Sequence, residues 1–392
     1  MSARFRFAVV ALAAAAAGVL PPAAAAGAGP APVRVSHPTA PDGTPVEFPR
    51  AINERGEILG LVSTGDGLTY TTAVWRRGQV SVVGDPDVPL TMPFDARALS
   101  DRGHVAGFHL LSFDQTRPFS WQAGQLTDLP IDHPSGGVQD VNDHGDALGV
   151  VGDDAFGGTQ VVGWVDGALV TPPPGVRLSP SFAFPRVLNN RNEAAVDLIV
   201  DGLPQAAVWD LDTNEVTPLG TLGGLGSSVV AINEAGDVTG TSDTVSEAGH
   251  AFLWRRGTMI DLGTLGGPSS MPVAINDRGH VTGTSTVAGG GPAQAFLWRD
   301  GRMEELPSLG GTAGWPVSSP ADINNRGQVV GNSTTPDGAS HAVLWQQDGE
   351  VVDLSAALDP VQPAFPVDVN DRGQVLGWVR HTPIGVSVVW AT

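Results

Sequence analysis

The residues of this chain best suited to bind a ligand are arginines that recur directly after an acid or an amide. Arginine binds carboxylates and other planar polar groups well, because its guanidinium presents a rigid fork of donors. If these positions meet on one face of the fold, they form a collar for an anionic or polyhydroxylated ligand. We name this set the arginine collar, and its members are Arg55, Arg102, Arg191, Arg278, Arg326 and Arg372. The alternative is local charge pairing within solvated turns.

One tryptophan adds a candidate contact to this set. Trp315 lies in the loop Gly314-Trp315-Pro316, outside the regular tryptophan series described below, and we expect it to be exposed. An exposed aromatic ring offers a flat apolar face beside a polar edge, which suits stacking on a sugar. Trp315 is therefore included among the candidate binding residues.

Motifs for catalysis, metals and cofactors do not stand out. The run Gly263 to Gly267 is rich in glycine like a phosphate loop, but we expect a strand after it and not the helix that such a loop needs. No two histidines have the spacing of a metal site, and neither a calcium loop nor a Gly-x-Ser-x-Gly elbow is present. We therefore predict no catalytic residue, no metal site and no cofactor. A hydrolase or lyase that acts on polysaccharide is the alternative, because carboxylate pairs are not identifiable among so many acids.

Charge and composition exclude several other classes of function. The chain of 392 residues has 41 acids against 21 basic residues and a net charge of −20, which opposes binding to nucleic acid. All 21 basic residues are arginine, so chemistry that depends on lysine is excluded. Cysteine is absent as well, so neither a disulfide nor a thiolate metal site can form. The 51 glycines, 32 prolines and 41% hydrophobic residues favour many short strands joined by turns.

Two residue types recur with the same period and divide the chain into eight repeats. Tryptophans follow one another at steps of 43 to 47 residues, at Trp75, Trp121, Trp164, Trp209, Trp254, Trp298, Trp345 and Trp390. A second marker precedes each tryptophan by 20 to 22 residues, and it is Ser100 in one repeat and asparagine in the others: Asn53, Asn142, Asn189, Asn233, Asn276, Asn324 and Asn370. We expect these tryptophans to form the core of the repeats.

Each marker asparagine opens a hairpin of the form Asn-x-x-Gly between two short apolar strands. A type I turn favours Asn, Asp or Ser at its first position, and the residue that ends it must tolerate positive φ. Ser100 and Asn192, which replace the asparagine and the glycine in one repeat each, meet the same requirements. A second glycine in the following strand becomes Val196 in the fourth repeat. That glycine indicates close packing of neighbouring backbones and not positive φ.

Four short strands in about 45 residues predict one blade of a β-propeller. The strand His250 to Trp254 is apolar on both faces, as expected where blades stack. The eighth repeat ends at Trp390 without a fourth strand, whereas Val33-Arg34-Val35 precedes the first repeat. We therefore predict an all-β fold in which residues 27–392 form one domain, an eight-bladed β-propeller of four-stranded blades closed by the N-terminal strand. A seven-bladed propeller with a spare repeat is the alternative.

The N-terminus has the features of a secretory signal peptide. Arg4 and Arg6 are followed by an apolar run from Phe7 to Leu20 and by the small residues Ala24 to Ala26. We predict a signal peptide over residues 1–26, an extracellular mature chain, no later membrane span and a monomer. The function predicted is non-catalytic, either ligand binding or a scaffold role, with an extracellular carbohydrate or protein as partner. A structural cell-surface protein is a further alternative.

Repeats five to seven share further residues. His-Ala-Phe stands at residues 250–252, and the runs Leu219 to Gly224, Leu262 to Gly267 and Leu306 to Gly311 open these repeats. In these features the chain resembles the HAF-repeat family of bacterial extracellular proteins, although Pro307 and Ser308 depart from the pattern. The other repeats keep only the asparagine, glycine and tryptophan skeleton. The resemblance implies secretion and a repeat fold, and it supplies no catalytic residues.

Overall fold

Strands joined by tight turns make up almost all of the secondary structure, as the composition predicts. The computed structural model describes residues 33–40, 42–63, 70–84, 94–112, 115–153, 160–179, 186–311, 316–381 and 384–391. The expected signal peptide, residues 1–26, lies outside the described residues. Those that are described belong to one unit, Val33–Thr392, in which we find no helix long and apolar enough to cross a membrane.

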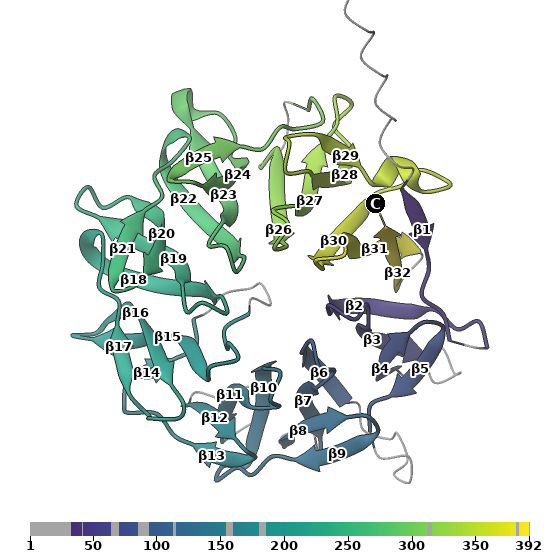
Figure 1. Cartoon of the computed structure of the whole chain (residues 1–392), viewed down its shortest axis with the longest axis vertical. Helices are drawn as coiled ribbons and strands as arrows, with labels where there is room; N and C mark the ends of the chain where they lie inside the picture. The colour runs from purple at the N-terminus through teal and green to yellow at the C-terminus, as the bar shows by residue number, and fades with distance from the viewer. Residues whose placement is uncertain are drawn as a thin grey trace, which may run out of the picture. The chain divides into compact units, whose positions relative to one another are not determined.

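The strands of the described residues form six four-stranded sheets and one eight-stranded sheet, all antiparallel between successive strands. Each four-stranded sheet is one tryptophan repeat, and the eight-stranded sheet combines the first repeat with the last. We number the repeats 1 to 8 along the chain. Their sheets follow one another around a common centre, as Figure 1 shows.

The bounds of the strands in the first four repeats are as follows. Repeat 1 contains β2 (Val46–Ile52), β3 (Ile58–Ser63), β4 (Tyr70–Arg76) and β5 (Gln79–Val82). Repeat 2 contains β6 (Phe94–Leu99), β7 (Val105–Leu110), β8 (Thr116–Gln122) and β9 (Gln125–Asp128). Repeat 3 contains β10 (Ser135–Val141), β11 (Ala147–Gly152), β12 (Gln160–Val165) and β13 (Ala168–Val170). Repeat 4 contains β14 (Val176–Arg177), β15 (Glu193–Val200), β16 (Leu203–Asp210) and β17 (Val216–Pro218).

The last four repeats add two short 3-10 helices. Repeat 5 contains β18 (Gly223–Ile232), β19 (Val238–Thr244), β20 (Gly249–Arg255) and β21 (Thr258–Asp261). Repeat 6 contains β22 (Gly266–Ile275), β23 (Val281–Val287), η1 (Ala288–Gly290), β24 (Gln294–Arg299) and β25 (Arg302–Glu305). Repeat 7 contains β26 (Ser318–Ile323), β27 (Val329–Thr334), β28 (Ser340–Trp345), β29 (Val351–Asp353) and η2 (Ser355–Ala357). Repeat 8 contains β30 (Ala364–Val369), β31 (Gln374–His381) and β32 (Ile384–Ala391), with β1 (Arg34–Ser36) beside β32.

The first and last repeats meet at β32. Strand β1 pairs antiparallel with β32, with Val35 opposite Trp390, so a segment from the start of the chain supplies the fourth strand of repeat 8. Further along the same edge of β32, Glu47 of β2 forms a bridge with Val386. These two pairings place the N-terminal strand where the sequence led us to expect it.

The hairpin after each first strand is built around its marker residue. Asn276 is buried, and its Oδ1 accepts the backbone N–H groups of Arg278 and His280 at 3.1 and 2.9 Å. The glycines that end these turns have φ between 75° and 88°, and Asn192, which replaces one of them, has φ of 58°. The turn therefore has the left-handed residue that the sequence pattern predicts.

The second glycine, which every repeat except repeat 4 contains, lies opposite a β-bulge or irregularity in the first strand. In repeat 6 the bulge leaves Val273 unpaired between Pro272 and Ala274. A Cβ on Gly283 would lie 2.0 Å from the carbonyl oxygen of Met271, so only glycine fits. In repeat 4, β14 pairs with β15 only at Asp197 and Leu198, beyond Val196. The close-packing interpretation of this glycine is confirmed.

The hydrophobic core lies between consecutive repeats. Trp209 of repeat 4, for example, is fully buried in a cluster with Leu148 and Val161 of repeat 3. Repeats 8 and 1 share such a cluster too, formed by Ile52 and Ile58 with Leu376 and Val389. Strands in the middle of each sheet are covered on both faces, so their residues are mostly buried, including polar ones such as Thr239 and Thr282.

The marker asparagines also join neighbouring repeats. The Nδ2 of each one donates to the backbone carbonyl of the next marker, at 2.9 to 3.2 Å. These clamps include Asn53 to Ser100 and Asn370 to Asn53, the second of which links the last repeat to the first. Ser100 has no amide to donate, so seven of the eight junctions carry a clamp. We did not anticipate this second role of the asparagine from the sequence.

Candidate functional site

A cavity of about 1100 Å³ is lined by residues of all eight repeats. Its wall consists mainly of the first strands, which lie nearest the centre in Figure 1. Positions along these strands are best counted from the marker residue. The residue after the marker, the one before it and the one three before it recur in the wall, so three levels of side chains surround the cavity.

At the level of the turns the wall is acidic. We name the residues directly after the markers the acidic rim: Glu54, Asp101, Asp143, Asn190, Glu234, Asp277, Asn325 and Asp371. Each rim side chain accepts a backbone N–H from the preceding repeat, at 2.6 to 3.0 Å. The donor is the preceding rim residue itself except at Asp143, where it is Arg102. The circuit includes Asp371 donating to Glu54, so it continues from the last repeat to the first.

The arginine collar lies outside this cavity wall. All six of its members are exposed and none lines the cavity, whereas the rim residue beside each one does. Two of the arginines hold the neighbouring turn, because Arg55 donates to the carbonyl of Arg102 and Arg372 donates to the carbonyl of Arg55. Arg191 pairs with Glu193 at 2.7 Å. The structure thus places the six arginines on the same face as the rim but does not bring them together around the cavity.

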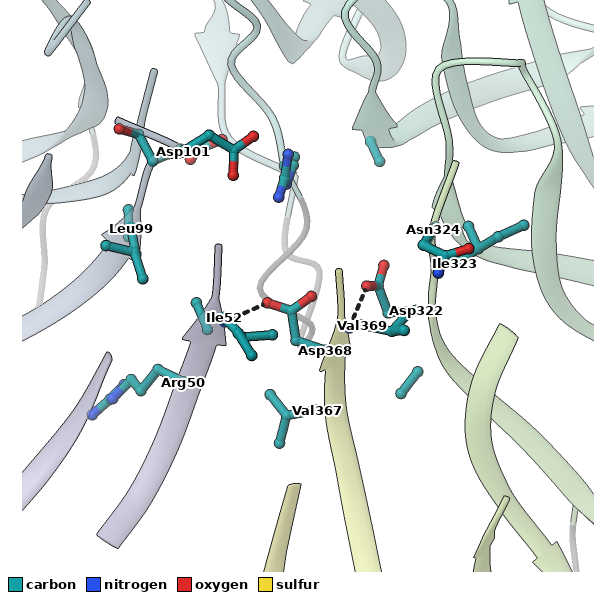
Figure 2. A pocket seen from close by; sticks show the side chains of 18 of the residues that line it. Arg50, Ile52, Leu99, Asp101, Asp322, Ile323, Asn324, Val367, Asp368 and Val369 are labelled. Atoms are coloured by element: carbon teal, nitrogen blue, oxygen red, sulfur yellow. Dashed lines mark hydrogen bonds between the residues drawn. The ribbon is translucent and has the colours of Figure 1, made fainter. Parts of the chain in front are cut away.

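Below the rim, apolar residues alternate with three inner carboxylates. The residues directly before the markers form a belt of Ile52, Leu99, Val141, Leu188, Ile232, Ile275, Ile323 and Val369. Asp140, Asp322 and Asp368 come one position earlier and accept backbone N–H groups of the next repeat. Asp368 accepts from Ile52 at 2.8 Å and Asp322 from Val369 at 3.1 Å, as Figure 2 shows.

Arg186 brings a cation into this acidic surrounding. Arg186 lies in repeat 4, in the segment between β14 and β15. Its backbone carbonyl accepts the N–H of Ile232. Its side chain is accessible to solvent and lines the cavity. Among the described residues we find no hydrogen bond or ion pair to its guanidinium.

The surrounding carboxylates act on Arg186 across the cavity. Enclosure alone would lower the pKa of the Arg186 guanidinium, but the negative charges of Asp101, Asp368, Asp322 and Asp140 raise it above its ordinary value. These four acids belong to repeats 2, 8, 7 and 3. The guanidinium therefore stays charged at any working pH and sits within the field of carboxylates from opposite walls.

Burial acts on the pKa values of several carboxyl groups in the wall. Burial raises the pKa of Asp140 to about 6, despite the backbone N–H groups that it accepts. Burial and the neighbouring charge of Asp368 raise the pKa of Asp322 well above its usual range. Burial, followed by like charges on the rim, also raises the pKa values of Glu54 and Glu234.

These raised values predict that stability falls as pH rises. In the folded state Asp140 keeps a proton that the unfolded chain releases near pH ~4, so its contribution to stability is complete below that pH and is lost as pH rises to about 6. We expect Asp140→Asn to reduce the loss by about 3 kcal/mol, because its amide oxygen still accepts N–H groups but carries no charge. Urea unfolding at pH 4 to 8 measures this. The exposed Asp348→Asn serves as the control and should leave the pH profile unchanged.

At the third level, three residues before each marker, the wall is polar in the first repeats and apolar in the last ones. The residues three before the markers are Arg50, Arg97, Gln139 and Arg186 in repeats 1 to 4, but Val273, Ala321 and Val367 in repeats 6 to 8. Where a bulge is present, it is this residue that the bulge leaves unpaired. Bulges commonly aim a side chain away from the ladder, and here they aim it at the cavity.

The aromatic contact of the cavity differs from the one expected. Trp315 lies outside the described residues. Trp378, which also falls outside the regular tryptophan series, lines the cavity from β31 and stacks on Phe365 with ring centroids 4.3 Å apart. The eight regular tryptophans do not line the cavity.

No known protein family and no curated protein matches this chain. Solved β-propeller structures are similar at low identity. The β-propeller domain of the Trilobed protease from Pyrococcus furiosus is 12% identical, with a TM-score of 0.46 over 79% of this chain and 97% of that domain. TolB from Acinetobacter baumannii is 12% identical, with a TM-score of 0.36 over 82% of this chain and 78% of TolB. Pyrococcus horikoshii acylaminoacyl peptidase is 14% identical, with a TM-score of 0.42 over 85% of this chain and 57% of the peptidase.

Similarities at this level carry no argument about function. The architecture itself is that of a β-propeller, because four-stranded antiparallel sheets surround a shared cavity with their first strands innermost. In this architecture the cavity is the place where residues of every repeat converge. We therefore regard the rim, the inner carboxylates and Arg186 as the candidate functional site.

Proposed function

We propose that this chain is a secreted, non-catalytic β-propeller that binds a carbohydrate in its central cavity. The observation that carries the proposal is the Arg186 guanidinium among carboxylates of facing walls. A sugar hydroxyl both donates and accepts hydrogen bonds, so one polyhydroxylated ligand can donate to the carboxylates and accept from the arginine. A fully anionic ligand would meet the six rim carboxylates and the three inner ones. A neutral polyol avoids that repulsion.

The propeller proposed has eight blades, one for each tryptophan repeat. Support comes from the junction of repeats 8 and 1, where β1 pairs with β32 and Asn370 donates to Asn53 at 3.1 Å. The rim contact from Asp371 to Glu54 and the shared hydrophobic cluster lie at the same junction. A seven-bladed ring with a spare repeat would lack these contacts between first and last repeats.

Export and membership of the HAF-repeat family belong to the same proposal. Support for export comes from the basic start, apolar run and small residues of positions 1–26. His250 of the family triplet lies 3.0 Å from Asp261 of the neighbouring strand, and His341 lies 2.8 Å from Asp353 in the same way. These pairs give the histidine a structural role, which agrees with a triplet that marks repeats and carries no chemistry.

The test is a binding screen with the purified chain and neutral oligosaccharides. The panel comprises cellohexaose, xylohexaose, mannohexaose and chitohexaose, measured by calorimetry, with chromatography of the same samples to detect cleavage products. We expect at least one member to bind, and Arg186→Met to weaken that binding at least tenfold, or about 1.4 kcal/mol. Because Arg186 faces four carboxylates, its replacement should also lower the melting temperature, so binding is measured at 25 °C after circular dichroism has shown that the variant is folded.

The arginine collar supplies the matched control. Replacing Arg278, Arg326 and Arg372 together by glutamine removes three exposed cations on the same face without touching the cavity wall. We expect this triple variant to bind as the parent does. If it loses binding while Arg186→Met keeps it, the collar and not the cavity is the site. Cleavage products would replace the non-catalytic proposal by that of a polysaccharide-acting enzyme.

A further inference from the structure

Arginines line the end of the cavity away from the rim. Arg50 and Arg97 lie 2.7 and 3.4 Å from the carboxylate of Asp95. A third arginine, Arg380 of β31, is exposed and lines the same cavity, and among the described residues its guanidinium has no hydrogen bond or ion pair. Such a guanidinium can hold an anion, and the pair is strongest when the partner is a carboxylate or phosphate.

An aromatic platform lies beside Arg380. Trp378 is two residues before it on the same strand, so both side chains emerge from one face of the sheet. Phe365 supports one side of the Trp378 ring. Gly385 also lines the cavity, and a Cβ there would come within 3.0 Å of Trp378 Cε3. Glycine at this position therefore leaves room against the ring that any other side chain would occupy.

Phe48 faces this end from the first repeat in an unusual conformation. Its φ is 44°, a left-handed value that costs a bulky residue about 1–2 kcal/mol, and its side chain is 44% exposed. It lies where three residues of β2, Phe48 to Arg50, are unpaired between Glu47 and Ala51 in the ladder with β3. Strain of this kind gathers at ligand-binding positions, and here it exposes an aromatic ring in the cavity wall.

We propose that Phe48, Arg50, Trp378 and Arg380 form a subsite for a uronic-acid residue of the bound carbohydrate. The apolar face of a pyranose ring stacks on Trp378, and its carboxylate meets the guanidinium of Arg380, with Arg50 on the facing strand β2. The neutral sugars of the same chain extend towards the rim. This inference rests on the proposed function and names the class of carbohydrate.

The test compares aldopentaouronic acid, in which four neutral xylose residues carry one 4-O-methylglucuronic acid, with its methyl ester. The two probes share their rings and hydroxyl groups and differ only at one carboxyl group, which is charged in the acid and esterified in the other probe, so their affinity ratio isolates the carboxylate contact. For the unaltered chain we expect the acid to bind at least tenfold more tightly at low salt, with the ratio falling as salt increases. Arg380→Gln should bring the ratio close to one and leave the methyl ester affinity unchanged. The exposed Arg326→Gln is the matched control and should keep the ratio.

Each result decides between the two levels of the proposal. Equal binding of the acid and the ester, or a preference retained by Arg380→Gln, overturns the uronate subsite. If neutral hexaoses bind through Arg186 but aldopentaouronic acid does not, only the subsite is wrong. If no oligosaccharide of either panel binds, the proposed function itself fails. A melting temperature unchanged in Arg380→Gln shows that the loss is one of contact and not of folding.

Discussion

Replacing Gly283 by alanine should lower the free energy of unfolding by about 4 kcal/mol, which is enough to leave a large part of the protein unfolded at 37 °C. The new Cβ would lie 2.0 Å from the Met271 carbonyl oxygen and 2.7 Å from Pro272 Cα, both in the backbone of the paired strand. Backbone atoms of a bulged strand cannot yield without breaking ladder hydrogen bonds. Urea unfolding followed by tryptophan fluorescence measures the loss.

Gly257→Ala is the matched control for this experiment. Gly257 has φ of +81° in an outer hairpin, with no atom within 4 Å of an added Cβ, so its replacement should cost only about 1 kcal/mol from backbone conformation. Equal losses in the two variants would contradict the argument, because steric contact would then contribute nothing. In repeat 4, Val196 shows that a side chain is tolerated where the first strand does not press against this position.

Replacing Asn276 by alanine should cost about 3 kcal/mol. The buried side chain accepts two turn N–H groups and donates to the carbonyl of Asn324 at 2.9 Å, so three hydrogen bonds are lost, and the buried carbonyl and the two partly buried N–H groups are left without that partner. Serine at the same position should cost only about 1 kcal/mol. Ser100 shows why: its hydroxyl accepts the N–H groups of Arg102 and His104 and thus keeps the turn but not the clamp. Thermal and urea unfolding of both variants measure the difference.

Two outcomes would contradict this division of roles. If serine costs as much as alanine, the turn contacts contribute nothing to stability. If serine costs nothing, the clamp contributes nothing. The reverse substitution, Ser100→Asn, places an amide at the one junction between markers that lacks a clamp. It can be measured beside Asn276→Ala and Asn276→Ser.

The sequence predicts those parts of the fold that every repeat must satisfy alone. A turn that needs a left-handed residue accepts only Gly or Asn, so its position can be identified from the pattern at Gly279 and even at its exception, Asn192. The strand that completes repeat 8 is predictable as well, because a missing strand at one end of a periodic array matches a surplus strand at the other. Val35 pairs with Trp390 accordingly.

The site was less predictable because it depends on direction and on neighbours. Glu54 and Arg55 are adjacent in the sequence, yet the turn aims the acid at the cavity and the arginine at solvent. Nothing in the residue types alone fixes which of two adjacent polar side chains points inward. A contact with the preceding repeat fixes the inward direction of the acid, because the backbone N–H of Asp371 donates to the Glu54 carboxylate.

Arg186 was overlooked for a different reason. Periodic reasoning favours residues that recur, and Arg186 occupies the repeat whose first strand departs most from the pattern. One signal was available: residues three before the markers are arginine at positions 50, 97 and 186 and apolar in most later repeats. A repeat position that is polar or charged in the first four repeats and apolar in the last four predicts a cavity wall whose two halves differ, whatever the hairpins nearby contain.

The clamps between marker asparagines have an electrostatic consequence. Each amide points from one repeat to the next, so the amide dipoles run tangentially and follow one another in the same sense of rotation. Vectors that circulate in this way largely cancel when summed, unlike the aligned peptide dipoles of a helix. The electrostatic potential at a ligand in the cavity is therefore set by the ionisable groups of the wall and by their state of protonation. The clamps that hold the repeats together contribute little to it.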